Sequence, residues 1–402
     1  MSLPEENMKT ERAASKASII MFFLLLAMIF AVAVLVYLQS QDVDIKSIKA
    51  EEVLKKIFSA ANEKSDGEKS IEIPYDDKEG CVFTTYKDQI IKCSRNGIRG
   101  LDRNGNEVWS VYASMNSPRI KAGPDLVAYD AGGRELYVLS GKTVKWSRKL
   151  DNNIISADIS ESGHVSVIQE FKGYKGAVTI FNLQGNEFFT RTYAENHVLS
   201  SRVSPDGKYV LVNLVDTSDI HAGTSVEITD MLGKPNAAKI LRPGELLPVF
   251  GFLGHESIMY AGDNMVMCID KAGKEKWTQE FPGRNVFSAR TALGKYVFLA
   301  VSKEGKPGVF GSSSTEVRVL NSDGRQAAIF NIQGSAKNIR TYGDLAAVNT
   351  GREVYFADTR GRLTGKYTSK SDINDVHFLN KQEAVVITKS TIAVVKTAHD
   401  MK

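Results

Sequence analysis

The stretch LDRNGNEVW, Leu101 to Trp109, has a second version farther along the chain. Residues 268–277 read CIDKAGKEKW, where the same Asp-x-x-Gly-x-x-x-Trp spacing again follows an apolar run. In both places a polar turn with Gly joins two hydrophobic segments, a pattern typical of a hairpin between two β-strands. The recurrence indicates that one structural unit is used more than once.

Aligning the chain on the apolar run before this turn finds eight copies. They are GIRGLDRNG from residue 97, ELYVLSG from 135, AVTIFNLQG from 177, SVEITDMLG from 225, MVMCIDKAG from 265, EVRVLNSDG from 316, EVYFADTRG from 353 and TIAVVKTA from 391. Successive copies start 37 to 51 residues apart. Units of about 40 residues with strand patterns alone are typical of β-propeller blades. We therefore predict an all-β fold, an eight-bladed β-propeller over residues 70–398.

Each unit contains four strand patterns, named a to d from the axis outward. In the fifth unit they are LLPVFGFLG, ESIMYAG, MVMCIDKAG and KEKWTQEF. Trp109, Trp146 and Trp277 all fall on strand d, where a large flat side chain can cover the seam between blades. Strand c occurs eight times but strand d only seven times, so one strand d must come from elsewhere. We expect SIEIPYD, residues 70–76, to supply it and to remove two open sheet edges; seven blades is the alternative.

The Asp-x-x-Gly-x-x-x-Trp turn resembles the blade motif of pyrroloquinoline-quinone-type propellers. These include the quinoprotein dehydrogenases and the bacterial lipoprotein propeller of outer-membrane assembly. The Trp is present in three units, so this resemblance covers residues 71–398 as architecture alone. The chain is also similar to a Gram-positive domain family of unknown function, with a short tail, one span, a stalk and then NSPRIKAGPDLVAYDAGGRELYVL (residues 116–139). This second resemblance covers nearly the full length and implies no activity.

The quinoprotein resemblance implies a calcium-binding carboxylate site, a catalytic Asp and often a vicinal Cys pair, but none of these maps onto this chain. The six His residues form no HxH or HExxH pattern. The best local metal candidate is DTSDIHAGT at 216–224, although loops of this composition are more often solvated. The Gly-rich stretch at 305–311 lacks the strand–turn–helix context of a phosphate-binding loop. We predict no catalytic or metal-binding residues and no cofactor.

The N-terminal part contains an uncharged apolar stretch, IIMFFLLLAMIFAVAVLVYL, at residues 19–38. Twenty helical residues span roughly 30 Å, the thickness of the bilayer hydrocarbon core, so we predict a transmembrane anchor. A cleaved signal peptide is the alternative, but the only Ala-x-Ala pattern lies inside the apolar run. Three basic residues precede the span and four Lys residues follow it within 20 residues. We expect residues 1–18 in the cytoplasm and the propeller outside the membrane, with the reverse topology as the alternative.

Residues 39–69 place apolar side chains at roughly helical spacing between Ile45 and Phe58, with Lys and Glu among them. This spacing predicts a short stalk helix or linker. We expect its apolar stripe to pack on its own domain; packing on a partner is the alternative.

The chain has three Cys residues and no CxxC pair, which argues against a structural zinc site. If residues 86–88 form the first hairpin turn, Cys81 and Cys93 lie directly opposite one another, close enough for a strained disulfide. If the turn is shifted by one residue, the two Cys residues lie diagonally across the strand pair and cannot form the bridge. Both are then expected to be small buried hydrophobic residues. Cys268 is expected as an unpaired core residue.

Strand a carries a base three to five residues before the Gly of the a–b turn in four units. These bases are Arg119, Arg202, Arg290 and Arg340. Because strands a surround the central channel, a ring of guanidinium groups there is a candidate anion-binding site. The alternative is that the bases pair with Asp158, Asp375 or backbone carbonyls between blades.

The b–c loops at 170–176, 216–224 and 303–314 are longer than the others. In a propeller the b–c and d–a loops share one face, so these insertions converge on one surface, and loops on a rigid scaffold are where binding residues concentrate. Aromatic side chains are enriched at binding hot spots. The predicted partner contacts are Phe171, Tyr174, His221 and Phe310. Tolerated insertions without a role are the alternative.

The net charge of +4 comes from bases spread along the chain, so no nucleic-acid surface is indicated. We predict a single-pass membrane protein whose extracytoplasmic propeller is a non-catalytic binding or scaffold module of the cell envelope. Its expected partners are the membrane and another envelope or secreted protein. An enzyme with a site built from distant residues at the channel mouth, and a ligand sensor coupled to the membrane, are alternatives because a propeller hosts many functions.

Overall fold

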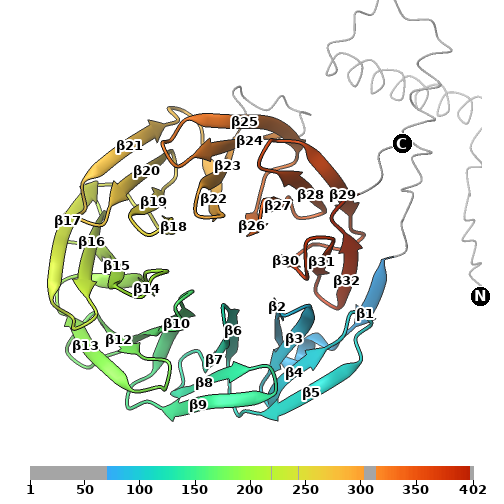
Figure 1. The fold of residues 1–402 in the computed structure, drawn as a ribbon, viewed down its shortest axis with the longest axis horizontal. Helices are drawn as coiled ribbons and strands as arrows, with labels where there is room; N and C mark the ends of the chain where they lie inside the picture. Colours follow the sequence, from blue (N-terminus) through green and yellow to red (C-terminus); the bar gives the residue numbers. More distant parts are fainter. Residues whose placement is uncertain (1–69, 219, 243, 303–313, 399–402) are drawn as a thin grey trace, which may run out of the picture. The chain divides into compact units, whose positions relative to one another are not determined.

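Eight four-stranded antiparallel sheets make up the part of the chain described by the computed structural model, residues 70–218, 220–242, 244–302 and 314–398. The sheets stand radially around a central axis, with one strand of each sheet at the axis and one at the circumference (Figure 1). The predicted all-β, eight-bladed propeller is therefore confirmed.

The strands follow the order a to d in every blade. Strands a are β2 (Val82–Tyr86), β6 (Pro118–Ala122), β10 (Ile154–Ile159), β14 (His197–Val203), β18 (Val249–Leu253), β22 (Val286–Ala292), β26 (Asn338–Tyr342) and β30 (Asp375–Phe378). Strands b are β3 (Gln89–Ser94), β7 (Leu126–Asp130), β11 (Val165–Gln169), β15 (Tyr209–Asp216), β19 (Ser257–Ala261), β23 (Tyr296–Ser302), β27 (Leu345–Asn349) and β31 (Glu383–Ile387). Strands c are β4 (Gly97–Leu101), β8 (Glu135–Ser140), β12 (Gly176–Phe181), β16 (Gly223–Asp230), β20 (Met265–Asp270), β24 (Ser314–Asn321), β28 (Glu353–Asp358) and β32 (Thr391–Lys396). Strands d are β5 (Glu107–Tyr112), β9 (Thr143–Lys149), β13 (Glu187–Tyr193), β17 (Pro235–Arg242), β21 (Glu275–Glu280), β25 (Gln326–Gln333), β29 (Leu363–Thr368) and β1 (Ile71–Pro74). A short 3-10 helix, Asp77–Glu79, joins β1 to β2.

The middle strands are continuous apolar runs because each sheet packs between two others. Every residue of β7 and β11 is buried, whereas β5 at the circumference has none buried. Hydrophobic clusters fill the seams between consecutive blades. In one of them, Ile168 and Val178 of the third blade pack with Val210 and Val212 of the fourth.

The Asp-x-x-Gly motif forms the turn between strands c and d. In the first blade Asp102 Oδ1 accepts the backbone N–H groups of Asn104 and Asn106, both at 2.8 Å, and Gly105 has a φ of 88°. A positive φ favours Gly at this place, and the carboxylate satisfies two turn amides. The same pair of side-chain-to-backbone bonds recurs at Asn182, Asp230, Asp270, Asn321 and Asp358.

The N-terminal strand closes the ring. β1 pairs antiparallel with β32, with Ile73 opposite Ile392, and so becomes strand d of the last blade. Tyr75 adds a hydrogen bond from its hydroxyl to the Thr388 carbonyl, 2.6 Å long. The predicted closure by residues 70–76 is confirmed, and the eighth sheet joins both ends of the described chain.

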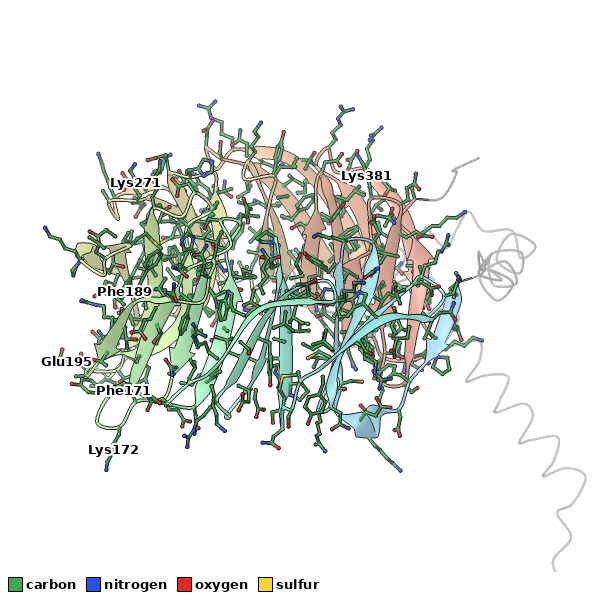
Figure 2. The ribbon with its side chains drawn as sticks, turned by 60° about the horizontal axis from the view of Figure 1, so that its bottom comes forward. Phe171, Lys172, Phe189, Glu195, Lys271 and Lys381 are labelled. Carbon is green, nitrogen blue, oxygen red and sulfur yellow. The ribbon has the colours of Figure 1, made fainter. Side chains whose placement is uncertain are left out.

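The loops divide between two faces of the ring. The b–c and d–a loops form the long-loop face, and the a–b and c–d turns form the short-turn face. In Figure 2, Phe171, Lys172 and Glu195 lie along one edge of the ring and Lys271 and Lys381 along the opposite edge. β1 begins at the short-turn face, because Ile71 pairs with Val394 while Pro74 pairs with Thr391, next to the b–c loop.

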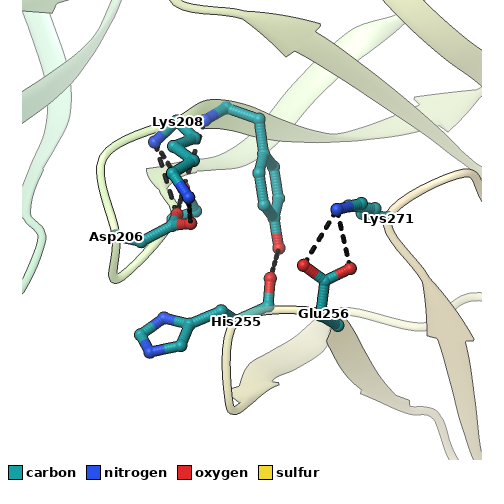
Figure 3. Close-up of polar contacts among 7 residues, drawn as sticks. Asp206, Lys208, His255, Glu256 and Lys271 are labelled. Atoms are coloured by element: carbon teal, nitrogen blue, oxygen red, sulfur yellow. Dashed lines mark hydrogen bonds and ion pairs between the residues drawn. The ribbon is translucent and has the colours of Figure 1, made fainter.

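Polar contacts at the short-turn face link neighbouring blades and also turns of one blade. The Tyr209 hydroxyl donates to the His255 carbonyl at 3.0 Å. Beside it, Lys271 and Glu256 form an ion pair of 2.7 Å between the c–d and a–b turns of the fifth blade (Figure 3). At this face the a–b turn of the fifth blade is therefore linked both to the fourth blade and to the c–d turn of its own blade.

The predicted tail at 1–18, transmembrane helix at 19–38 and stalk at 39–69 lie outside the described residues. Within the described ranges, no helix is long and apolar enough to cross a bilayer.

Cys81 and Cys93 are free thiols, so the considered disulfide is not formed. The first hairpin turn consists of Lys87 and Asp88, both with positive φ, and it pairs Val82 with Cys93. This is the one-residue change that places the two Cys residues diagonally. Cys93 therefore faces the seam with the second blade, while Cys81 packs in the seam with the last blade. Cys268 is buried and unpaired, as predicted.

Candidate functional site

Two aromatic side chains stand together on the long-loop face, in the loop between β11 and β12. The rings of Phe171 and Tyr174 meet edge to face, with centroids 5.6 Å apart and planes at 73°. A tight turn brings them together, since the Tyr174 amide donates to the Phe171 carbonyl at 3.0 Å and Gly173 has a φ of 85°. A Cβ at Gly173 would meet nothing within 4 Å, so the turn projects into solvent.

This aromatic pair borders a pocket of about 440 Å³ between the second and third blades. The pocket, which we call the aromatic pocket, is lined by Arg134, Asp151, Asn152, Asn153, Ile155, Glu170, Phe171, Lys172, Tyr174 and Lys175. All of these residues except Ile155, which lies on β10, come from b–c or d–a loops or their edges. Of the three predicted long loops, the one at 170–176 contributes to the pocket, and most of the one at 303–314 lies outside the described residues, so convergence of all three stays a prediction.

Hydrogen bonds hold the walls of the pocket in place. The Glu170 amide donates to the Asn153 carbonyl at 2.9 Å, and the Asn153 side chain donates to the Glu170 carboxylate at 2.9 Å. On the other side, Lys175 Nζ donates to Thr217 Oγ1 in the next b–c loop, at 3.2 Å. Two of the long loops are thus in direct contact across a blade boundary.

Exposed apolar side chains lie at the pocket and in other loops of the long-loop face. Tyr174 is 45% and Ile155 47% exposed at the pocket itself. Farther along, Ile220 is 92% exposed in the β15–β16 loop and Leu246 is 45% exposed before β18. Apolar surface on neighbouring loops, bordered by charged groups, is typical of a protein interaction site.

The four predicted contact residues have different outcomes. Phe171 and Tyr174 are brought together in the pocket. His221 is exposed in the next b–c loop, beside Gly244. Phe310 lies outside the described residues. Lys172 and Lys175 lie in the same loop as the aromatic pair, whereas Arg134 of the second blade and Ile155 on β10 were not predicted, because neither carries a motif.

In the candidate metal-binding loop at 216–224, the carboxylate of Asp216 accepts hydrogen bonds from the loop itself. Asp216 Oδ1 accepts the backbone N–H of Ser218 at 2.9 Å and its hydroxyl at 2.7 Å. Across the described ranges, no three side chains of metal-ligating types gather at one place.

Strands a place the predicted bases around the axis, where two of them form ion pairs. Arg202 binds the carboxylate of Asp158, which also binds Lys121 Nζ at 3.1 Å. Arg340 binds Asp375 through Nε at 3.1 Å and Nη2 at 2.6 Å. Pairing with Asp158 and Asp375, the alternative considered from the sequence, is confirmed for these two bases.

The basic partners control the charge of both carboxylates. Burial acts to raise the pKa of Asp158, but the charges of Arg202 and Lys121 outweigh it, and the pKa lies below its ordinary value. The pKa of Asp375 is likewise lowered, because hydrogen bonds from His377 and Arg340 outweigh the effect of burial. Both groups are therefore carboxylates at neutral pH.

The remaining two bases are arranged differently. Arg119 donates to the carbonyl of its neighbour Pro118 at 3.0 Å. Arg290 is half-buried on β22. Burial, together with the charges of Arg202 and Arg340, lowers the pKa of Arg290 to about 10. Within the described ranges, Arg290 is in no ion pair with a carboxylate.

The fold defines the class of β-propeller repeat proteins, whose rigid ring presents loops for recognition. Within that class, the chain belongs to the family of unknown function DUF5711, whose model matches residues 62–397. No curated protein matches the sequence.

Solved propellers resemble the chain in fold alone. BamB from Moraxella catarrhalis is 15% identical, with a TM-score of 0.51, and the match covers 81% of this chain and 98% of BamB. The C-terminal WD40 domain of Sif2 is 13% identical, with a TM-score of 0.61 and coverage of 82% and 97%. Sqt1 from Chaetomium thermophilum, solved bound to the N-terminus of the ribosomal protein L10, is 12% identical, with a TM-score of 0.56 and coverage of 82% and 100%.

Proposed function

We propose that this chain is a non-catalytic binding module that captures a partner protein on its long-loop face. The aromatic pocket carries this proposal. An edge-to-face aromatic pair on a rigid ring offers apolar contact at low cost in conformational entropy. Sqt1, a propeller of similar fold, was solved with a protein N-terminus bound, which supports a role in protein recognition for a ring of this kind.

The chemistry of the pocket favours a peptide segment of the partner as the ligand. Phe171, Tyr174 and Ile155 contribute apolar surface to a pocket whose other lining residues are charged or polar and include Lys172 and Glu170, of opposite charge. A buried apolar centre with a polar rim is the usual anatomy of a protein interface. We expect one apolar side chain of the partner to enter the pocket.

Membrane anchoring is a further part of the proposal. The uncharged stretch at 19–38 is long enough to span a bilayer. Since β1 begins at the short-turn face, a chain that arrives from an N-terminal anchor enters the ring there. The long-loop face then points away from the membrane, toward an envelope or secreted partner, with residues 1–18 in the cytoplasm.

Affinity purification of the tagged full-length chain from membranes tests the binding site. Proteins captured by the wild type are compared, by quantitative mass spectrometry, with those captured by a Phe171→Ala/Tyr174→Ala double variant. Leu232→Ala is the control, because Leu232 is 84% exposed on the opposite face. We expect at least one protein to be reduced tenfold or more by the double variant alone. Equal capture by all three, at equal melting temperature, would remove the proposal.

Cysteine labelling in intact cells tests the topology. In a Cys81→Ser background, Lys172→Cys places a thiol on an exposed loop. A cell-impermeant maleimide should label it without lysis. Labelling that requires lysis would reverse the proposed orientation while leaving the binding face untouched.

A further inference from the structure

In every blade, a residue at the end of strand a or directly after it closes the a–b hairpin with its backbone. The residue two places before it occupies an equivalent position in all eight blades. The closing residues follow from the strand pairing and turn hydrogen bonds. The occupants of this position, which we call the axial ring, are Thr84, Lys121, Asp158, Arg202, Gly251, Arg290, Arg340 and His377. Because the position is equivalent, these residues lie at a similar depth along the axis.

Ion pairs between consecutive blades neutralise part of the charge of the ring. Asp158 lies between Lys121 and Arg202 and binds both. Arg340 binds Asp375, which lies one step deeper on the next blade and also contacts His377 at 3.3 Å. Two carboxylates are thus shared among the basic groups on either side of Arg290.

Arg290 has no acidic neighbour in the ring. The preceding position is Gly251, and a Cβ there would lie 2.8 Å from the Thr291 side chain, so the close approach of β18 and β22 leaves this place without a side chain. The following position is Arg340, a like charge. In the ring, Arg290 thus has on one side a position without a side chain, Gly251, and on the other side a second base, Arg340.

The charge on the innermost strands is unbalanced. The eight strands a carry five permanent bases, Arg119, Lys121, Arg202, Arg290 and Arg340, against the two acids Asp158 and Asp375. The whole sequence has a net charge of only +4. Five bases minus two acids leave the innermost strands with an excess of three positive charges.

Solvent reaches these groups. The side chains of Arg202 and Arg340 keep 28% and 33% of their surface exposed. Arg202 also lies over the Phe250 ring at 5.0 Å, which fixes its orientation. Arg340 uses two of its donors on Asp375, and a guanidinium has five. Donors therefore remain for a ligand beside Arg290.

We propose that the axial ring binds a small multivalent oxyanion of the phosphate or sulfate type, held by Arg290 with the free donors of Arg202 and Arg340. Guanidinium groups match the oxygens of such anions and bind them through paired hydrogen bonds. A dianion at this point balances most of the excess charge of strands a and relieves the repulsion among the three Arg residues. This site is independent of partner binding on the long-loop face.

Binding of inorganic phosphate to the purified full-length protein in detergent tests the site. Calorimetry and thermal melting are measured in phosphate and in chloride at the same ionic strength. We expect phosphate to bind and to raise the melting temperature above that in chloride. Arg290→Met should weaken phosphate binding at least tenfold, and Arg290→Lys should retain part of it. Arg325→Met, an exposed base on a c–d turn of the same blade, is the matched control and should bind as the wild type does.

Two results would overturn the site. One is an equal effect of phosphate and chloride on the wild type, which would reduce the anion effect to screening. The other is a lower melting temperature of Arg290→Met in chloride, which would mean that Arg290 has a stabilising partner within the chain. We expect this variant to melt at or above the wild-type temperature, because it removes an unpaired charge.

Discussion

The indole of Trp146 on β9 lies directly against Gly185 in the c–d turn of the next blade. A Cβ at Gly185 would be 2.6 Å from the Trp146 ring, and the indole N–H donates to the Leu183 carbonyl at 3.0 Å. Trp277 and Gly324 repeat this arrangement, because a Cβ at Gly324 would be 2.5 Å from the Trp277 ring. The Trp and the Gly of the repeated motif thus belong to one contact, made between consecutive blades.

Gly185→Ala should destabilise the propeller more than the same change at Gly141. Both glycines lie in c–d turns with a positive φ, so both substitutions carry the same type of backbone strain. A Cβ at Gly141 meets nothing within 4 Å, whereas at Gly185 it displaces Trp146. We expect an additional loss of about 1–3 kcal/mol for Gly185→Ala, measured by chemical denaturation. Equal losses would show that the indole contact contributes nothing to the seam.

Closure of the ring gives a second prediction. Ile73 of β1 occupies the place of the seam Trp in the last blade, since a Cβ at Gly105 would be 2.7 Å from its side chain. Ile73→Asp places a charge in this apolar contact and should cost roughly 2–4 kcal/mol. Glu72→Gln, on the exposed side of the same strand, is the control. Thermal melting checks this, and an unchanged melting temperature for Ile73→Asp would mean that β1 is dispensable for closure.

The ion pair of Asp375 predicts a dependence of stability on pH. Because the folded-state pKa of Asp375 lies below that of an unfolded Asp, about 3.9, the carboxylate stabilises the fold above about pH 4. This contribution is lost as the pH falls toward the folded-state pKa. Asp375→Asn should therefore be less stable than the wild type at pH 7, and the difference should shrink below about pH 4. Urea unfolding at both pH values measures it, with Asp323→Asn in an exposed turn as the control. A difference that grows on acidification would contradict the assignment.

The three thiols should react at different rates in the folded protein. Burial raises the pKa of Cys93 to about 12 and that of Cys268 to about 11, and both side chains are buried. Cys81 is half-buried, and the thiolate is the reactive form. Alkylation with iodoacetamide followed by mass spectrometry should modify Cys81 first and the other two after unfolding. Early modification of Cys93 would contradict the seam packing described for it.

The blade number and the closure could be predicted because they depend on local signals. The c–d turn requires a short side chain that accepts hydrogen bonds, such as Asp102, and a Gly with positive φ. The blades with such a turn can therefore be recognised from the sequence. The sequence contains eight strand c patterns but only seven strand d patterns between them, so residues 70–76 could be predicted as the eighth strand d. Trp109 packs against the seam between the first two blades, as predicted, but its ring lies over Gly100 of its own sheet and its N–H donates to Gln89 at 2.7 Å, so it does not repeat the contact of Trp146 and Trp277.

Register and tertiary neighbours could not be predicted from the same signals. The first hairpin turn uses Lys87 and Asp88, and this shift of one residue separated Cys81 from Cys93. The same limit affected the axis. Counting back from the turn Gly selected Arg119, but turns of unequal length place Lys121 at the equivalent position. The aromatic pocket combines loops of two blades, and their proximity exists only in the closed ring.

The most direct measurement compares the two faces of the ring in living cells. A photo-activated cross-linking amino acid is placed at Phe171 on the long-loop face or at Lys271 on the short-turn face, positions at opposite edges of the ring (Figure 2). Illumination of cells that carry the full-length chain should give a discrete cross-linked protein from position 171 and none from position 271. That cross-link should disappear when Tyr174→Ala is introduced beside the probe. A cross-linked partner from position 271 alone would contradict the account, because it would place recognition on the opposite face.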